Sequence, residues 1–457
     1  MNLGTLPYCE GSRRVKAQLY AAGLLPEVAR LWRWAPNGAL ALLDQGLISG
    51  SNFVLGVSLA RRAGPDAYGA YVVMFAAFLL IANLHQALLL EPTNVLAFSL
   101  FPERSDRYLR AVLSMHAIFT AAFWVPASLV WILATRAQVR YLLVNALAGL
   151  LIATPCVLLF WLARCFSYLD FAPGRAARGS FLYTAVMFAG LLVSFGYRSV
   201  TPLSVFICTA LAAVCASSFL LAPYRRKRPA NRPEPDLREV WRRHWRFGRW
   251  GLSTVCLSWA QTNSISFVSG SLLGLTATGG LNALIGLLLP MFQVLSAVTR
   301  VVLPPIARMN AKGGVQSTRR PVLRVAATLI LLTTAYWLAL LFGHNLLLHW
   351  TYGQRFVIYA HLAPVIGLHL VACAVITACD IGFNSIQSPK SAFRIKLLMV
   401  ALMLPVTTAM MLRFGLLGAV IGVPGLSAAT AVFMGLKLRR VWQEKRLVAV
   451  EGVTANV

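Results

Sequence analysis

The sequence predicts an all-α polytopic membrane protein with about twelve transmembrane helices, arranged in two lobes of six. Apolar runs of roughly 20 residues recur along the chain, and a helix needs about that length to cross ~30 Å of hydrocarbon. Charged residues make up only 12% of the 457 residues, and the mean hydropathy is +0.69. Soluble proteins carry about 25% charged residues. In addition, the second half of the chain repeats features of the first.

The first two spans form a hairpin between Gly38 and Pro92, around the polar turn RRAGPDAYG. At 100° per residue, the first limb has one polar stripe. Its members are Asp44, Gln45, Ser49, Ser51, Asn52 and Ser58. Such a stripe is expected to face a water-filled cavity or other helices, and an intramembrane carboxylate is a functional candidate. The alternative is an interfacial Asp44, because this residue follows Gly38 closely.

The remaining predicted spans follow in order along both halves. In the first half they lie near residues 111–134, 141–163 and 180–195, with a sixth ending near Ala222. In the second half they lie near residues 250–273, 280–303, 322–342, 357–381, 393–412 and 416–436. The predicted organisation is a basic segment 1–37, an N-lobe 38–222, a basic linker 223–249, a C-lobe 250–436 and a tail 437–457.

Two short stretches outside the spans read as amphipathic helices lying in the membrane interface. One is LLPEVARLWRW near the N-terminus, and the other is the Trp- and Arg-rich stretch near Val240–Trp250. Basic residues together with tryptophan favour a position against anionic headgroups.

The formal net charge of +28 is explained by membrane topology. With both termini cytoplasmic, most Lys and Arg residues lie on the cytoplasmic side, as the positive-inside rule requires. The opposite face carries Arg61, Arg62, Arg136, Arg140, Arg198, Arg355 and Arg413. The basic charge therefore requires no nucleic-acid partner.

Spacings in the two halves indicate a duplication. The spacing Asn52–Gly69 recurs in Asn263–Gly280, and the spacing Arg164–Pro173 recurs in Asp380–Pro389. Because each unit holds an even number of spans, both copies insert the same way round and are related by an axis along the membrane normal. Lobes of this kind usually bind substrate between them. A chance coincidence of Gly and Pro positions is the alternative.

No enzyme is evident in the chain. It has no GxxxxGK[ST] loop, HExxH or GxSxG motif, and the loops on the outer face are short. The eight cysteines show no CxxC or metal-ligand spacing and read as small apolar packing residues. We therefore expect no catalytic residues, no metal and no cofactor, with H⁺ or Na⁺ as a possible coupling ion.

A sparse set of intramembrane polar residues forms the candidate translocation cavity. Its members are Asp44, Asn52, Glu91, Arg164, Arg300 and Asp380. An arginine there would hold phosphate with its forked donors, and the acids would pair with it or carry coupling ions. Snorkelling of Arg164 and an interfacial Glu91 are the alternatives. His369 shares a helix face with Asp380, and a packed histidine is favoured there over a proton relay.

The stretch LLDQGLISGSNFVLGVSLARRAGPDAYGAYVVMFAAFLLIANLHQALLLEPTNV resembles the opening of bacterial polysaccharide flippases. These form the polysaccharide transport branch of the multidrug/oligosaccharidyl-lipid/polysaccharide (MOP) exporter superfamily. The resemblance rests on the DQ pair, SGSNF, the AR before a Gly-Pro turn, the Tyr-Gly pair and the closing EP. The stretch NALIGLLLPMFQVLSAVTRVVLPPIARM is similar to the family's seventh-to-eighth region.

The resemblance implies a MATE-like, V-shaped arrangement of two lobes in the bacterial inner membrane. It implies a substrate, an undecaprenyl-pyrophosphate-linked oligosaccharide unit, moved outward for O-antigen or exopolysaccharide assembly. Membrane lipids would be its surroundings, and a polysaccharide polymerase and chain-length machinery would be its partners. Two other functions stay open: an ion-coupled multidrug exporter of the same superfamily, and a membrane enzyme of envelope sugar assembly. Lipid II flippases resemble the chain too, but typically have two further spans.

Overall fold

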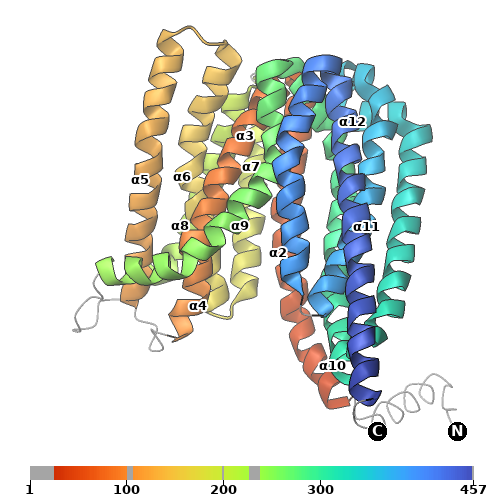
Figure 1. The fold of residues 1–457 in the computed structure, drawn as a ribbon. Coiled ribbons are helices and arrows are strands. Elements are labelled where there is room, and N and C mark those ends of the chain that lie inside the picture. Colours follow the sequence, from red (N-terminus) through yellow and green to blue (C-terminus); the bar gives the residue numbers. More distant parts are fainter. Residues whose placement is uncertain (1–24, 100–105, 198–199, 226–236, 387, 455–457) are drawn as a thin grey trace, which may run out of the picture.

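The computed structural model describes residues 25–99, 106–197, 200–225, 237–386 and 388–454, and over these residues the chain is helical without strands (Figure 1). The N-terminal half holds α2 (Leu25–Ala63), α3 (Pro65–His85), the π-helical turn η1 (Gln86–Leu90), α4 (Glu91–Ser99), α5 (Asp106–Arg136), α6 (Tyr141–Leu169), α7 (Pro173–Gly196) and α8 (Pro202–Arg225). The C-terminal half holds α9 (Leu237–Leu272), α10 (Leu275–Tyr352), the 3₁₀ helix η2 (Gln354–Leu362), α11 (Ala363–Ser385) and α12 (Pro389–Thr454).

These helices contain the predicted spans. Within the described ranges, nine helical stretches are long and apolar enough to cross a membrane. One of them lies in α12 and contains Gly415, whose φ of 59° bends the helix between two predicted spans. Two further long helices, α2 and α9, hold the predicted first and seventh spans. With α12 divided at Gly415, the segments match the twelve that the sequence predicts.

Two lobes divide the molecule (Figure 1). In the N-lobe, α6 packs on α3, α5 and α8, and α7 packs on α2 and α8. In the C-lobe, α11 packs between α10 and α12, and α12 also contacts α9. The lobes meet where α3 packs against α10 and α9. One cluster of buried apolar residues runs across this junction, from Tyr68 and Tyr71 of α3 to Tyr352 of α10 and Phe356 of η2, so the lobes share a core where they meet.

The second helix of each lobe starts in the same way. Gly64 precedes α3 with φ 87°, and Gly274 precedes α10 with φ 85°. Glycine adopts this left-handed region without steric cost, which allows the sharp reversal between consecutive spans. The two glycines are therefore equivalent, which supports the internal duplication.

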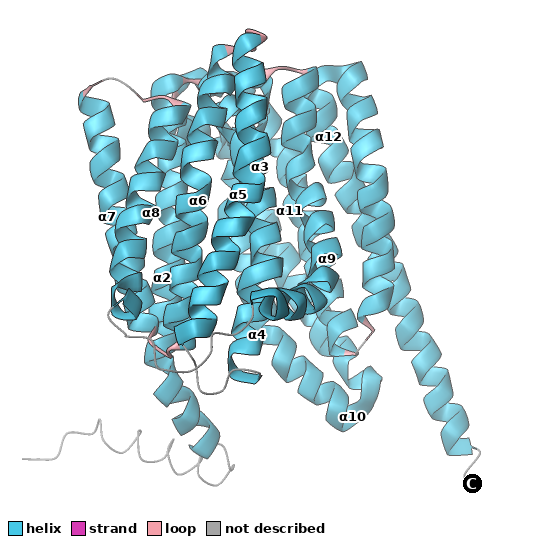
Figure 2. Ribbon diagram, turned by 90° about the vertical axis from the view of Figure 1, so that its left-hand side faces the viewer, coloured by secondary structure: helices cyan, strands magenta, loops and turns pink. Residues whose placement is uncertain are grey.

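The first turns of α9 run across the end of the N-lobe before the helix turns into the bundle (Figure 2). Val240, His244 and Gly248 are buried at four-residue intervals, while Trp241 and Trp245 are exposed. This is the amphipathic helix that the sequence predicts there. The sequence also predicted a separate interfacial helix over LLPEVARLWRW near the N-terminus. In the structure, residues 25–37 instead form one continuous helix with the rest of α2.

Candidate functional site

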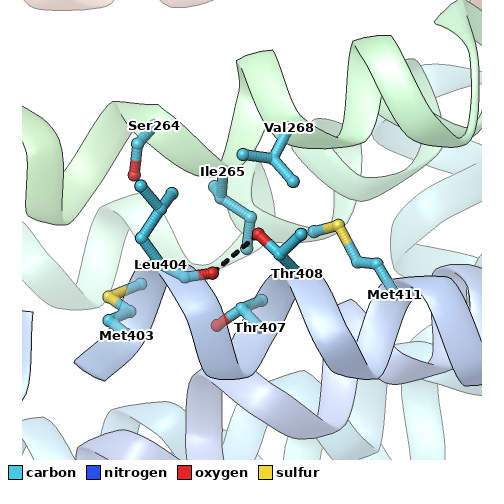
Figure 3. Close-up of a pocket in the computed structure, with 8 residues that line it drawn as sticks. All are labelled: Ser264, Ile265, Val268, Met403, Leu404, Thr407, Thr408 and Met411. Atoms are coloured by element: carbon cyan, nitrogen blue, oxygen red, sulfur yellow. Dashed lines mark hydrogen bonds between the residues drawn. The ribbon is translucent and has the colours of Figure 1, made fainter. Parts of the chain in front are cut away.

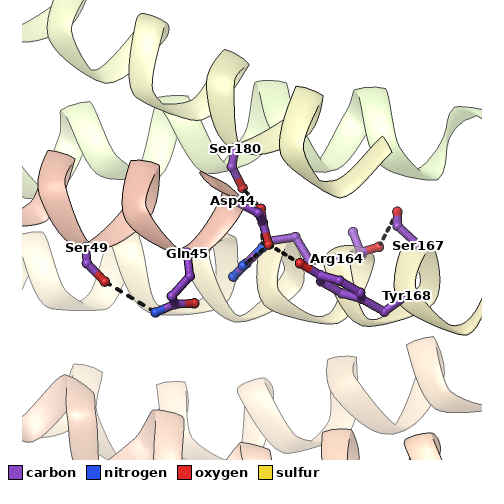
Figure 4. A network of polar contacts seen from close by, with 8 residues as sticks. Asp44, Gln45, Ser49, Arg164, Ser167, Tyr168 and Ser180 are labelled. Carbon is purple, nitrogen blue, oxygen red and sulfur yellow. Dashed lines mark hydrogen bonds and ion pairs between the residues drawn. The ribbon is translucent and has the colours of Figure 1, made fainter. Parts of the chain in front are cut away.

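Asp44 lies in a buried cluster of polar side chains between α2, α6 and α7 (Figure 4). Arg164 donates from Nε to Oδ1 at 3.2 Å and from Nη2 to Oδ2. Tyr168 donates its hydroxyl to Oδ2 at 2.5 Å, and Ser180 donates to Oδ1. The Asp44 side chain has no exposed surface. Its charge is therefore balanced and hydrogen-bonded, as burial of a carboxylate requires.

Local helix geometry explains how this Asp44 cluster forms. Arg164 and Tyr168 lie four residues apart on α6 and so share one face of that helix. Asp44 and Ser180 come from α2 and α7, which pack against each other. The sequence singled out Asp44 and Arg164 but missed Tyr168 and Ser180. The four-residue spacing to Arg164 was a usable signal for Tyr168, whereas nothing in the sequence pattern pointed to Ser180.

Arg164 keeps donors that Asp44 does not use. Within the described residues, its Nη1 makes no hydrogen bond. The side chain is 14% exposed, and its guanidinium lies 5.7 Å from the ring centroid of Phe160. A guanidinium carries five N–H donors in a planar fork. Arg164 can therefore hold Asp44 and still offer N–H groups to an anion.

The C-lobe has an ion pair of its own. Lys396 Nζ lies 2.6 Å from Asp380 Oδ2, and both side chains are half-buried. Asp380 thus has a partner on α12 within its own lobe. His369 contacts the Cys373 thiol at 3.4 Å from Nε2 and the Phe292 ring, with centroids 5.6 Å apart. These contacts support the packed histidine over the relay with Asp380.

Among the described residues, Glu91 and Asn52, two other predicted cavity residues, make no hydrogen bond to the Asp44 cluster. Glu91, at the start of α4, accepts a hydrogen bond from Gln86 at 3.3 Å. Asn52, on α2, accepts one from Tyr183 at 3.4 Å. Arg300 lies within α10, and its side chain is outside the described part of the structure. The structure thus brings together Asp44 and Arg164 of the six predicted residues.

Close backbone packing joins the lobes at one end, here named the closed end. A Cβ on Gly69 would overlap the carbonyl of Leu275, and a Cβ on Gly279 would overlap the carbonyl of Pro65. The contact is reciprocal, as at an interface between two symmetry-related surfaces. The spacings had paired Gly69 with Gly280, whereas the structure makes Gly279 the equivalent of Gly69.

Arginines predicted to lie outside the cytoplasm gather at this closed end. The Arg355 guanidinium stands over Gly64, Arg140 lies near Gly274, and Arg61 donates to the carbonyl of His349 at 3.3 Å. Their common position agrees with the prediction that they share one membrane face.

A small apolar pocket lies between α9 and α12 in the C-lobe (Figure 3). Its cavity volume is about 10 Å³, and it is lined by Ser264, Ile265, Val268, Met403, Leu404, Thr407, Thr408 and Met411. The Thr408 hydroxyl bonds to the carbonyl of Leu404 at 2.7 Å, while the buried Thr407 hydroxyl has no partner among the described residues. The pocket is too small for an oligosaccharide unit.

No family model and no curated protein matches the chain. Its fold is similar to an inward-facing multidrug resistance MATE family transporter of the MOP superfamily, with TM-score 0.67 and 14% identity over 88% of this chain and 98% of that one. It is similar to the lipid II flippase MurJ in an inward closed conformation, with TM-score 0.66 and 14% identity over 87% of each chain. An outward-facing MATE family structure gives TM-score 0.57 and 12% identity over 89% of this chain and 94% of that one.

These similarities establish the fold, a multi-pass membrane architecture that MATE transporters and the MurJ flippase share. The TM-score is higher for the inward-facing than for the outward-facing MATE structure. This order agrees with tight packing at the end predicted to be periplasmic.

Proposed function

We propose that the protein is a flippase for undecaprenyl-pyrophosphate-linked oligosaccharide units. It moves them from the cytoplasmic to the periplasmic leaflet of a bacterial inner membrane, for O-antigen or exopolysaccharide assembly. The similarity to both a drug exporter and a lipid-linked flippase supports export by this fold in general. The choice of substrate rests on the resemblance of the sequence and on the chemistry of the Asp44 cluster.

The observation that carries the proposal is the asymmetry within this cluster. The carboxylate has no room for a further ligand. Asp44 accepts hydrogen bonds from Arg164, Tyr168 and Ser180, and its side chain has no exposed surface. The arginine, in contrast, does not use all its N–H donors. Arg164 is partly exposed, and its Nη1 makes no hydrogen bond within the described residues. The group therefore offers donors to an incoming ligand, which suits a pyrophosphate and does not suit a cation.

Asp44 has a positioning role in this proposal. By binding Nε and Nη2, it fixes the plane of the Arg164 guanidinium and keeps Nη1 directed away from itself. A fixed guanidinium loses less conformational entropy on binding an anion than a mobile side chain does. The exposed Gln45 and Ser49, bonded to each other at 3.3 Å on the same helix, add hydroxyl and amide groups for sugar.

Alternating access requires the closed end to open. In the described conformation the backbone of α3 touches that of α10 around Gly69 and Gly279. An outward-open conformation must break this contact, while the lobes close at the opposite end. With both termini in the cytoplasm, opening of the closed end would release the substrate on the periplasmic side. A polysaccharide polymerase and chain-length machinery would then take up the product.

The alternative is an ion-coupled multidrug exporter, and Glu91 is the observation that favours it. This carboxylate is partly exposed and accepts one hydrogen bond within the described residues, from Gln86. It is thus better placed than Asp44 to meet a cationic compound. The two functions predict opposite charge preferences for the transported headgroup.

The test is a headgroup-accessibility assay in proteoliposomes that contain fluorescent lipid-linked oligosaccharide. We expect wild-type protein to expose the lipid in the far leaflet, and Arg164→Lys to do so at least about tenfold more slowly, or ~1.4 kcal/mol in the barrier. Arg175→Lys is the matched control, because Arg175 pairs with Asp170 in the same lobe. Expulsion of cationic dyes without lipid movement would establish the exporter instead.

A further inference from the structure

Two histidines from different helices meet inside the N-lobe. His85 is the last residue of α3, and His116 lies on α5. His85 Nε2 and His116 Nδ1 are 3.0 Å apart, with the rings at 85° to each other. Both residues are buried, with exposed fractions of 0% and 6%. The Phe119 ring packs on the His85 ring, with centroids 5.3 Å apart. The Asp44 cluster contains neither histidine.

One nitrogen of this pair is unused. His85 Nδ1 is buried and has no hydrogen-bond partner within the described residues. A neutral imidazole has one N–H donor and one acceptor nitrogen. Because His85 Nε2 already contacts His116, Nδ1 is either an acceptor without a donor or an N–H donor without an acceptor. A buried polar group without a partner is energetically unfavourable, and ionisable groups inside a bilayer commonly mark proton pathways.

The pair stands directly before an irregular turn of the helix. His85 precedes the π-helical turn η1, and π-helical turns occur frequently at functional sites. His244 of α9 lies 3.1 Å from the carbonyl of Leu88 in this turn. A Cβ on Gly248 would overlap the carbonyl of Ala87 in the same turn. Because α9 is the helix that leads from the linker into the C-lobe, the turn after His85 supports the connection between the lobes.

We propose that the His85–His116 pair is a proton-binding site that couples transport to a proton gradient. The inference rests on the proposed transport function and names its coupling ion. One additional proton binds the pair and converts two neutral rings into an imidazolium hydrogen-bonded to an imidazole. The same proton leaves when the pair reaches water on the other side, so nothing else is consumed. A charge in this apolar setting favours rearrangement of the adjacent turn, and thus of α9.

Titratable groups on the surrounding elements include Glu91 on α4, Tyr108 and Arg110 on α5, and His244 on α9. Of these, Glu91 binds Gln86, and Tyr108 lies 2.9 Å from His244. Within the described residues, the His85 ring contacts His116 and Phe119. Two imidazole nitrogens suit a proton, whereas a hard cation such as Na⁺ takes oxygen ligands. The composition of the pair therefore selects H⁺.

The first test measures proton binding without any substrate. Purified protein in nanodiscs is titrated from about pH 8 down to about pH 3, because desolvation moves the titration of buried histidines below the ordinary imidazole range. We expect His85→Gln and His116→Gln each to bind about one proton fewer than wild type, because each variant abolishes the pair. His369→Gln, which removes a packed C-lobe histidine, is the matched control. The proton that His369→Gln no longer binds must titrate at a different midpoint pH from the proton that His85→Gln no longer binds. Identical curves for wild type and His85→Gln would overturn the proposal.

The second test measures coupling in proteoliposomes with the fluorescent lipid-linked oligosaccharide. We expect an inward-directed proton gradient to accelerate lipid flipping several-fold in wild type and His369→Gln. The same gradient should leave the flipping rate of His85→Gln and His116→Gln unchanged. Gradient-stimulated flipping that persists in His85→Gln would overturn the coupling site while the proposed function stands. A third outcome is that wild type moves no lipid at any pH, while His85→Gln still binds one proton fewer than wild type. In that case the substrate assignment fails and the proton site stands.

Discussion

The hydroxyl of Thr276 donates a hydrogen bond to the carboxylate of Asp66, and each is the second residue of its helix. α3 and α10 are thus joined at equivalent positions by a contact that crosses the axis between the lobes. The carboxylate also lies at a helix N-terminus, where negative charge is favourable. Together with the reciprocal glycine contacts, this hydrogen bond holds the closed end together.

A methyl group at Gly69 is expected to open the closed end. Alanine at this position would meet the carbonyl of Leu275, a backbone atom that cannot rotate away. Alanine itself favours a helix by about 1 kcal/mol over glycine, so α3 remains intact. Spin labels at the exposed Tyr197 and Leu272 should therefore report a longer distance in Gly69→Ala than in wild type.

Gly46→Ala is the control for this experiment, because a Cβ at Gly46 meets no atom within 4 Å. It should leave the label distance unchanged. An unchanged distance in Gly69→Ala would show that the glycine contact does not hold the lobes together.

Removal of Asp44 should destabilise the protein far more than removal of a partly exposed acid. Asp44→Ala leaves the largely buried Arg164 charge without its partner, which typically costs about 3–5 kcal/mol. Glu239→Ala breaks the pair with Arg243 on α9, in which both side chains are exposed, and should cost about 1 kcal/mol or less. The measurement is the free energy of unfolding in mixed detergent.

The double variant Asp44→Asn/Arg164→Gln separates the two effects in the Asp44 cluster. It has no uncompensated charge and should recover part of the lost stability, while lipid flipping stays slow. A double variant that flips lipid at the wild-type rate would remove Arg164 from the proposed mechanism.

The sequence predicted the spans well because each is defined by its own composition. Apolar length and polar loops depend on local residues, and so α5 and α6 lie where the sequence placed them. The Asp44 cluster is different. Helical periodicity gives the face on which Asp44 lies, but it does not say that this face meets α6 and α7. Pairing with Arg164 depends on packing between distant segments, which the periodicity of one helix cannot encode.

The same limit explains two other differences. The repeat spacings paired Gly69 with Gly280, because the sequence alone does not reveal a shift of one residue between the copies. The shift appears once the copies are aligned at Gly64 and Gly274, which precede equivalent helices. The contact of His85 with His116 was not predicted at all. These residues are far apart in the sequence and carry no common motif, so only the packing of α3 near α5 reveals them.

Thr407→Val should stabilise the C-lobe. The Thr407 hydroxyl is buried at the pocket between α9 and α12 and has no partner among the described residues, so replacing it with a methyl removes a desolvation cost of about 1–3 kcal/mol. Thr333→Val is the matched control, since the Thr333 hydroxyl bonds to the carbonyl of Leu329 at 2.8 Å. Thermal unfolding should show a higher midpoint for Thr407→Val and an unchanged or lower one for Thr333→Val. A lower midpoint for Thr407→Val would mean that its hydroxyl is satisfied in the membrane.

The docking of α9 on the N-lobe should weaken as the pH falls. His244 lies on α9 before the predicted span, and burial lowers its pKa from 6.5 to about 4. Its Nδ1 lies 3.1 Å from the carbonyl of Leu88, which can only accept, so this nitrogen carries the proton and Nε2 accepts from Tyr108 at 2.9 Å. Above about pH 6.5 both the docked and the free histidine are neutral, and the stabilisation is complete. Between about pH 6.5 and 4 the undocked histidine binds a proton that the docked one does not, so stability is progressively lost.

The measurement is hydrogen exchange in the first turns of α9 at about pH 7 and about pH 4.5, corrected for the intrinsic pH dependence of exchange. Wild type should lose protection at the lower pH. His244→Gln has no imidazole to titrate and should show a smaller change, whereas His361→Gln, at an exposed position in η2, should behave as wild type. If protection falls equally in wild type and His244→Gln, another group controls the docking of α9. The His85–His116 pair, which lies beside the same turn, would then be the next pair of residues to replace.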